Sequence, residues 1–184
     1  MSYIPSPSEA MSILKKYNTQ QFHILHAATV GTVMRHFASL YDKQNQDYWE
    51  SVGILHDIDY ELYPNEHCSK AQIILKDMDI EENMIRSIAS HGYGICSDIK
   101  PESYMEKLLY AADELTGLIW ATALMRPSKS VMDLETKSVL KKFKQPSFAA
   151  AINRQVILDG AGMLDLDIEK LIFLTIEGMR KMEQ

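Results

Sequence analysis

The chain has few cysteines and no long apolar segment. Its two cysteines, Cys68 and Cys96, fit neither a disulfide framework nor a CxxC metal pair. The N-terminal sequence MSYIPSPSEA lacks the basic and apolar regions of a signal peptide. No apolar run approaches the roughly 18 to 20 residues that are needed to span a bilayer. We therefore expect a cytoplasmic protein with no membrane segment.

The chain also lacks an excess of positive charge. Its formal net charge is −6 at pH 7, which gives no general attraction to nucleic-acid backbones or anionic membranes. Nucleic acid is therefore not an expected partner, although the basic segment between 126 and 144 leaves room for it. Hydrophobic residues make up 46% and charged residues 24% of the 184 residues. This composition is typical of a folded globular protein and excludes a largely disordered chain.

Glycine and proline are scarce, at 8 and 6 residues, and the apolar residues recur at intervals of three and four rather than two. This pattern indicates helix nearly throughout, and we find no convincing strand. The sequence therefore predicts an all-α fold, a compact single-domain helical bundle over residues 1–184. Its core is expected at roughly 20–125, with C-terminal helices from 128–184 packed on it.

Apolar periodicity, caps and breakers place the individual helices. The segment 128–146 is polar and predicted to be partly helical, while Pro64 and Asn65 mark an irregular loop. A helix is predicted over each of the ranges of about 8–17, 21–41, 47–56, 69–78, 81–91, 101–125, 147–157 and 167–183.

Three ionisable residues fall on the apolar faces of these predicted helices. His26 lies four residues before Val30, and His56 lies four residues after Val52. Asp113 sits inside the apolar string LLYAADELTGLIW. A buried carboxylate without a partner costs several kcal/mol, so it is tolerated only when it is paired or bound to metal. Something must therefore neutralise Asp113.

A divalent metal ion is the partner that this pattern favours. The donor set of two imidazoles and two carboxylates suits Mn, Fe, Ni, Co, Zn or Mg, and does not suit Cu(I) or an iron-sulfur cluster. Four ligands leave coordination positions open, which marks a catalytic rather than a structural site. A single inward histidine is more often a hydrogen-bonded core residue, but the combination favours metal. The predicted ligands are His26, His56, Asp57 and Asp113.

Three strings carry a family resemblance. ILHAATVGTVMRHFA, GILHDIDYE and LLYAADELTGLI resemble, in this order, the His, His-Asp and Asp blocks of the HD-domain superfamily of metal-dependent phosphohydrolases. More narrowly, PNEHCSKAQIIL, the SHG that follows, RPSKSV and KSVLKKFKQPSFAAAINR are similar to small, bacterial, stand-alone HD proteins described as predicted hydrolases. The resemblance extends over nearly the whole chain.

The resemblance implies a helical bundle of the HD-domain type in which the same four residues bind the first metal ion. It also implies that His67 and His91 could hold a second ion bridged by Asp57, so one or two ions are expected. The alternative for each of these two histidines is an ordinary surface or loop-capping role. His23, which lies outside the strings, and His36, which lies within the first string but is not its predicted ligand, are both interpreted as structural.

The activity that the resemblance implies is metal-dependent hydrolysis of a phosphoester in a nucleotide or other small phosphorylated metabolite, by a metal-activated water. Asp57 would act through the ion, while Asp59 or Glu114 would orient or deprotonate the water. The alternative for these last two acids is a solvated or capping role. A sensor or scaffold that binds metal and nucleotide without catalysis, and a di-iron oxygenase, are the competing functions, and a homodimer is left open.

A basic segment supplies candidate substrate contacts. Between positions 126 and 144 there are six lysines and arginines against two acidic residues. Arginine grips phosphate with two parallel hydrogen bonds, and serine or lysine can assist it. The alternative is a solvated helix face. The predicted substrate-binding residues are Arg126, Ser128, Lys129 and Lys107.

Overall fold

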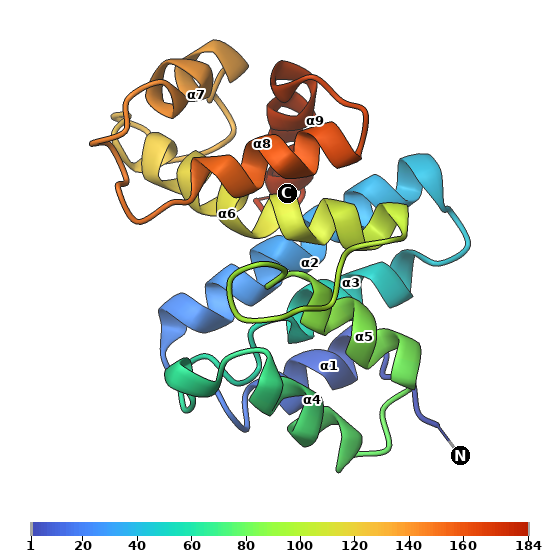
Figure 1. Ribbon diagram of the computed structural model, residues 1–184. Coiled ribbons are helices and arrows are strands. Elements are labelled where there is room, and N and C mark those ends of the chain that lie inside the picture. The colour runs from blue at the N-terminus through green and yellow to red at the C-terminus, as the bar shows by residue number, and fades with distance from the viewer. Residues whose placement is uncertain (1, 184) are drawn as a thin grey trace.

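The computed structural model describes residues 2–183 and is all-helical, which confirms the predicted fold class (Figure 1). Within these residues the extended backbone amounts to two isolated bridges, Tyr3 with Ile80 and Tyr93 with Ser97. The α-helices are α1 Pro7–Leu14, α2 Gln21–Tyr41, α3 Gln46–Leu55, α4 Ser69–Lys76, α5 Glu82–Ser90, α6 Tyr104–Leu124, α7 Thr136–Phe143, α8 Arg154–Met163 and α9 Ile168–Arg180, with a short 3-10 turn at Pro64–Glu66.

The two longest helices, α2 and α6, occupy the middle of the molecule. Helices α1, α3, α4 and α5 lie on one side of them, and α7, α8 and α9 lie on the other (Figure 1). The apolar stripe of α2 is buried as the periodicity predicts, with Val30, Val33 and Phe37 fully inaccessible to solvent. Tyr41, which the same stripe includes, is 50% exposed because it lies in the last turn of the helix.

Helix α6 begins later than predicted. Its first residue is Tyr104 rather than Pro101, because Ser103 and Glu106 form a capping box. The Glu106 backbone N–H donates to the Ser103 hydroxyl at 3.2 Å, and the Ser103 backbone N–H donates to the Glu106 carboxylate at 3.0 Å. The cap therefore outweighs the first-turn preference of Pro101.

Helix α8 is the largest departure from the predicted helices. Residues 147–152 form turns, and the helix begins after Asn153, whose side chain accepts hydrogen bonds from two first-turn N–H groups. It then runs on to Met163 rather than ending near 157. The Arg154 guanidinium donates to carbonyl groups between 143 and 152, so the preceding turns are held by a side chain rather than by helical bonds.

A close crossing of α2 and α3 places the first two histidines. A methyl group added to Gly53 would lie 2.8 Å from the Cα atom of Gly31 and 2.9 Å from its nitrogen. The two backbones can approach this closely only because both residues are glycine. His26 lies on α2 and His56 immediately follows α3, and the crossing brings the centres of their rings to 5.1 Å from each other.

Among residues 2–183, none of the helices combines the length and the apolar character that a membrane crossing requires.

Candidate metal centre

Four predicted ligands converge although they come from three separate parts of the chain. His26 lies on α2, His56 and Asp57 follow α3, and Asp113 lies in the middle of α6. The His26 Nε2 atom is 2.9 Å from Asp113 Oδ1 and 3.7 Å from Asp57 Oδ2. The His56 Nε2 atom is 3.5 Å and 3.4 Å from the same two oxygens. The four side chains therefore enclose one small volume.

His56 is held in the orientation that a ligand requires. Its Nδ1–H donates to the Gly53 carbonyl oxygen at 2.7 Å, which leaves the lone pair on Nε2 facing the cluster. That Nε2 atom is fully buried and has no hydrogen-bond partner among the described residues. A buried acceptor without a partner is costly. A cation at this point would satisfy it.

The spacing of the donor atoms also fits a metal ion. Ligand atoms about 2.1 Å from an ion lie about 3.0 to 3.4 Å apart around an octahedron or a tetrahedron. The contacts that His26 and His56 make with the two carboxylates span 2.9 to 3.7 Å. The residues present are therefore spaced as ligands of one divalent cation.

A second group of donors, His67 and His91, contacts the other oxygen of Asp57. We call the group around His26, His56 and Asp113 the first side of the metal centre, and this group the second side. The Asp57 Oδ1 atom is 3.4 Å from His67 Nε2 and 3.5 Å from His91 Nε2. Both rings are oriented through Nδ1, because His67 donates to Asp59 at 2.8 Å and His91 donates to the Ile88 carbonyl at 2.6 Å. The two Nε2 atoms then face each other at 3.1 Å. Two lone pairs at this distance require a proton or a cation between them.

The charges of the first group are strongly coupled. Burial alone would lower the pKa of His56, but the carboxylates of Asp57 and Asp113 raise it well above its ordinary value. Burial would raise the pKa of both carboxyl groups, but the imidazoles lower them well below their ordinary range. Without metal the two carboxylates therefore favour a proton on the His56 Nε2 atom, at the position that a cation would otherwise occupy. A cation would replace that proton.

The same balance holds at His67, on the second side. Burial alone would lower the pKa of this imidazole, and the hydrogen bond to Asp59 is the largest effect that opposes burial. The result is a pKa raised to about 10. Asp59 itself is fully buried, and its other oxygen accepts from the Ala71 backbone N–H at 2.8 Å. Asp59 thus positions His67 and does not line the cleft described next.

The cluster opens into a cleft of about 420 Å³. Three apolar side chains on its wall reach solvent: Phe22 is 73% exposed, Tyr60 44% and Ile95 63%. Glu114 also lines the cleft, and its carboxylate accepts from the Asn153 backbone N–H at 3.0 Å. Burial raises the pKa of Glu114, with a further contribution from the charge of Asp113. Its carboxylate therefore accepts a proton more readily than an exposed one.

The predicted substrate-binding residues lie elsewhere. Arg126 donates to Asp133 at 2.8 Å, and the Ser128 hydroxyl donates to the same carboxylate at 2.8 Å. Lys129 is exposed at a position with a φ of 51°. Lys107 lines a different hollow, beside Lys100 and residues 101–102. The four residues are not among those that line the cleft of the metal centre.

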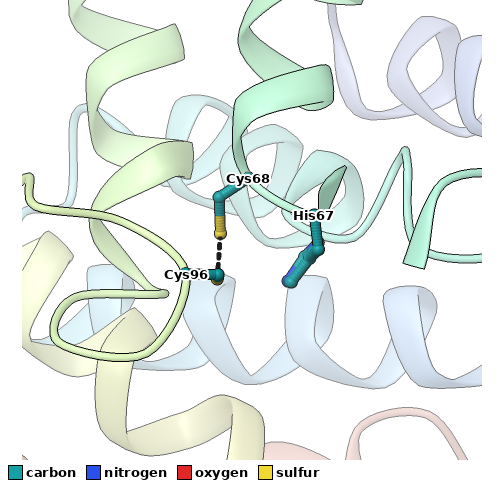
Figure 2. A group of neighbouring side chains, drawn as sticks. All are labelled: His67, Cys68 and Cys96. Atoms are coloured by element: carbon teal, nitrogen blue, oxygen red, sulfur yellow. Dashed lines mark hydrogen bonds between the residues drawn. The ribbon is translucent and has the colours of Figure 1, made fainter. Parts of the chain in front are cut away.

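Sequence reasoning missed one group of donors, formed by His67, Cys68 and Cys96 (Figure 2). The two thiols lie 28 positions apart with their sulfur atoms 2.7 Å from each other. No spacing rule connects them, because their contact depends on how the loop after α5 folds back on the start of α4. The only local signal is the pair of glycines, Gly92 and Gly94, which permits that loop.

The comparisons with known proteins give one informative relative. No family model and no solved structure matches the chain. The chain is 28% identical over 131 residues to a tRNA (cytidine(56)-2'-O)-methyltransferase of Picrophilus torridus, and the match covers 64% of this chain. It covers 38% of the relative, so the chain spans little more than a third of that protein's length. The chain is therefore similar to part of an enzyme.

This finding corrects several expectations drawn from the sequence. The relative is a methyltransferase, and no family model supports the HD-domain superfamily, so the assignment to that family and to its bacterial hydrolases is contradicted. Phosphoester hydrolysis of a small metabolite is contradicted with it, and neither the sensor nor the di-iron oxygenase gains support. The exclusion of nucleic acid is contradicted as well, because the relative is named for tRNA.

The reasons for these errors are physical. A donor set specifies the metal ions that it can bind, but a Lewis acid serves many different reactions, so the cluster never identified hydrolysis. The net charge of −6 is a sum over the whole chain, and excluding nucleic acid on that sum gave too little weight to the positive segment between 126 and 144. Local charge, rather than the total, decides contact with a phosphate backbone.

Proposed function

We propose that this chain is the metal-dependent, tRNA-binding part of a tRNA-modifying enzyme, and that it presents a tRNA ribose to the metal centre. The observation that carries the proposal is the similarity over 131 residues to part of a tRNA 2'-O-methyltransferase. The finer activity that this similarity supports is methylation of a ribose 2'-hydroxyl. The proposal concerns the tRNA side of that reaction.

The metal centre provides the chemistry that a ribose hydroxyl needs. His26, His56, Asp57 and Asp113 would hold the first divalent cation, and Asp57, His67 and His91 a second. A bound divalent cation supplies a Lewis acid that lowers the pKa of a hydroxyl group in contact with it. Glu114 is the chain's own candidate to accept the hydroxyl proton, since it lines the same cleft and burial raises its pKa.

The walls of the cleft suit a nucleotide. Single-stranded RNA is bound largely by aromatic side chains that stack on its bases. Phe22 and Tyr60 offer exposed rings at the mouth of the cleft. A volume of about 420 Å³ lies within the range of about 300 to 1,000 Å³ that small-ligand sites occupy. One nucleotide therefore fits beside the ligands, with its base on an aromatic ring.

The basic segment supplies contacts to the rest of the tRNA. Lys141 and Lys144 are exposed on and just after α7, and Lys142 is half-buried with its ammonium 4.5 Å from the centre of the Phe148 ring. Each lysine that neutralises a phosphate releases a counterion, so this binding is general for RNA and weakens with salt. The segment would therefore bring tRNA to the protein, and the cleft would select the nucleotide.

The experiment that tests the proposal is tRNA binding measured by fluorescence anisotropy, with the protein loaded with Mn²⁺ or stripped by a chelator. We expect removal of the metal to weaken binding by roughly tenfold or more, since metal removal takes a cation from the site. The His26→Ala, Asp113→Ala double variant should bind tRNA in the presence of Mn²⁺ as weakly as the stripped protein does. Equal binding of loaded and stripped protein would overturn the proposal, as would a failure of both to bind tRNA.

The finer activity has its own measurement. The loaded protein is incubated with tRNA and a sulfonium methyl donor, and digested tRNA is analysed for 2'-O-methylated nucleosides. In the reaction the ribose oxygen bonds to the methyl carbon, the carbon–sulfur bond breaks and the hydroxyl proton passes to Glu114. The Glu114→Gln variant should bind tRNA normally but methylate it at least about tenfold more slowly. A product formed equally by that variant would remove Glu114 from the proposal.

A further inference from the structure

Two thiols lie closer together than any metal would hold them. The Sγ atoms of Cys68, directly before α4, and Cys96, in the loop after α5, are 2.7 Å apart (Figure 2). A disulfide bond is about 2.05 Å long, whereas two thiolates on one tetrahedral zinc ion, each about 2.3 Å from it, are separated by about 3.8 Å. The observed distance is nearer to the disulfide.

The backbone around the pair is built to hold this contact. A side chain at Gly92 would overlap both sulfur atoms, so only glycine allows the two thiols to meet there. The backbone N–H groups of Cys96 and of both its neighbours donate to the Gly92 carbonyl, at 2.9 to 3.1 Å. Cys68 takes a φ of 65°, a costly conformation for a residue other than glycine. Three separate features therefore fix the position of the sulfurs.

The two thiols differ in access. Cys96 is partly exposed and lines the cleft, whereas Cys68 is fully buried behind it. A small oxidant that enters the cleft reaches Cys96 first. Cys68 then lies in position to attack that sulfur, as a resolving thiol does.

We propose that Cys68 and Cys96 form a reversible dithiol–disulfide site that a peroxide oxidises. The Cys96 sulfur attacks a peroxide oxygen, an S–O bond forms, the O–O bond breaks and the departing oxygen leaves as water or an alcohol, which gives a sulfenic acid. The Cys68 sulfur then attacks the Cys96 sulfur, the S–S bond forms, the S–O bond breaks and a second water leaves. Each thiol supplies one proton, and the peroxide takes the two electrons. A dithiol such as dithiothreitol reverses the change.

A metal ion bound by His67, Cys68 and Cys96 is the competing use of the same atoms. The donors number three, one fewer than a closed structural zinc site has. Both ring nitrogens of His67 are also engaged, Nδ1 with Asp59 at 2.8 Å and Nε2 with the His91 ring at 3.1 Å. Binding an ion to the thiols would require His67 to leave the second side of the metal centre. The geometry therefore favours the disulfide.

The disulfide would link two segments that carry histidines of the second side. Cys68 follows His67 directly, and the loop that carries Cys96 follows His91. Closing the sulfur atoms from 2.7 Å to about 2.05 Å is a small movement, so the helices are expected to stay in place. Oxidation would restrict the movement of the loop that carries Ile95 and Cys96, which form part of the wall of the cleft. It should raise the unfolding midpoint, because the cross-link restricts the unfolded chain.

The test uses the reduced full chain and needs neither tRNA nor an added metal, so its outcome is independent of the proposed function. The protein is treated with equimolar hydrogen peroxide, free thiols are alkylated, and the intact mass and peptides are measured. We expect one Cys68–Cys96 disulfide, loss of alkylation at both sites and full recovery with dithiothreitol. The Cys68→Ser variant should instead accumulate a sulfenic acid at Cys96, which dimedone traps, while Cys96→Ser should stay unreactive.

Three results would overturn the inference. One is zinc in the purified protein that Cys96→Ser removes and His26→Ala retains, which would assign the thiols to a metal. Another is direct oxidation of Cys96 to a sulfinic acid in the native chain, since a working resolving thiol prevents it. The third is full alkylation of both cysteines after the peroxide treatment. Far-UV circular dichroism of both serine variants checks that a negative result does not come from unfolding.

Discussion

The metal centre and the basic segment between 126 and 144 use ionisable side chains in opposite ways. In the metal centre, His56 and His91 are each oriented by a backbone carbonyl, and little of either ring is exposed. In the basic segment, Lys137 and Lys141 are exposed, and Lys137 is paired only with its neighbour Glu135. A cluster that must hold one geometry is buried and braced, whereas charges that act through solvent need neither. Single substitutions should therefore be decisive in the first region and additive in the second.

The largest effect is expected from Asp57→Ala. This carboxylate contacts the imidazoles of His26 and His56 through one oxygen and those of His67 and His91 through the other. Its removal should lower the affinity for Mn²⁺ at both sides, by roughly 100-fold or more. Elemental analysis and calorimetric titration measure the loss. The matched control is Asp77→Ala, an exposed carboxylate after α4, which should bind Mn²⁺ as the native chain does, and equal loss in both variants would refute the assignment.

A somewhat smaller effect is expected from pH. Metal must displace the proton of His56, whose pKa the two carboxylates raise against the effect of burial, so the affinity for Mn²⁺ should rise about tenfold for each pH unit and each proton released. Calorimetry in buffers of different ionisation enthalpy counts the protons. Binding without proton release would show that the imidazoles are already neutral.

The metal-free protein should show the opposite dependence on pH. The pKa of His67 is raised to about 10, so its favourable interaction is complete below the ordinary histidine range and is lost as pH rises toward 10. The unfolding temperature of chelator-treated protein should therefore decrease as the pH rises from neutral to 10. Added Mn²⁺ should flatten that fall. A midpoint that rises over the same interval would contradict a protonated His67 in the metal-free protein.

In the basic segment the expected effect is moderate and additive. Replacing Lys141, Lys142 and Lys144 together by glutamine should weaken tRNA binding by roughly tenfold and make it less sensitive to salt. Mn²⁺ binding should not change, because these residues do not line the cleft. A control variant with glutamine at Lys15 and Lys16, exposed at the end of α1, should retain native tRNA affinity. The comparison fails if the control is equally weakened.

The smallest effect is expected at Lys137. Its ammonium lies 2.7 Å from Glu135, but the two side chains are 81% and 58% exposed, so solvent screens the pair. Lys137→Ala should leave the unfolding midpoint unchanged and reduce tRNA affinity by less than about twofold. Thermal melting and anisotropy titration measure both. A large loss of affinity would show that this lysine makes a specific contact.

The fold could be predicted to the extent that its determinants are local. Helix α2 has the bounds that were predicted, because its apolar stripe runs along the whole segment. The period of that stripe also shows which face is buried. Helix α8 could not be placed, since its start depends on the Asn153 cap and its extension to Met163 on packing of Gly160 against Ala111 of α6. That contact joins residues far apart in sequence.

The same division applies to the site. Helical periodicity placed His26 and Asp113 on inward faces, but their meeting at 2.9 Å across 87 positions is a property of the packed helices. The pairing of Arg126 with Asp133 and the contact of Cys68 with Cys96 left no trace in sequence spacing. The reaction could not be predicted from the donor set, because the same metal ligands serve reactions on different substrates.

The carboxylate of Asp57, whose two oxygens face different donor groups, would make the order of ion loading a property of the protein. An ion on the first side draws electron density from the shared carboxylate and leaves it a weaker ligand for the next ion. The first side brings two carboxylates to its ion, and the second brings only the shared one. Occupancy should therefore proceed in sequence, with negative cooperativity. At limiting metal the molecule would be a one-ion protein, and the second ion would report the concentration of free metal around it.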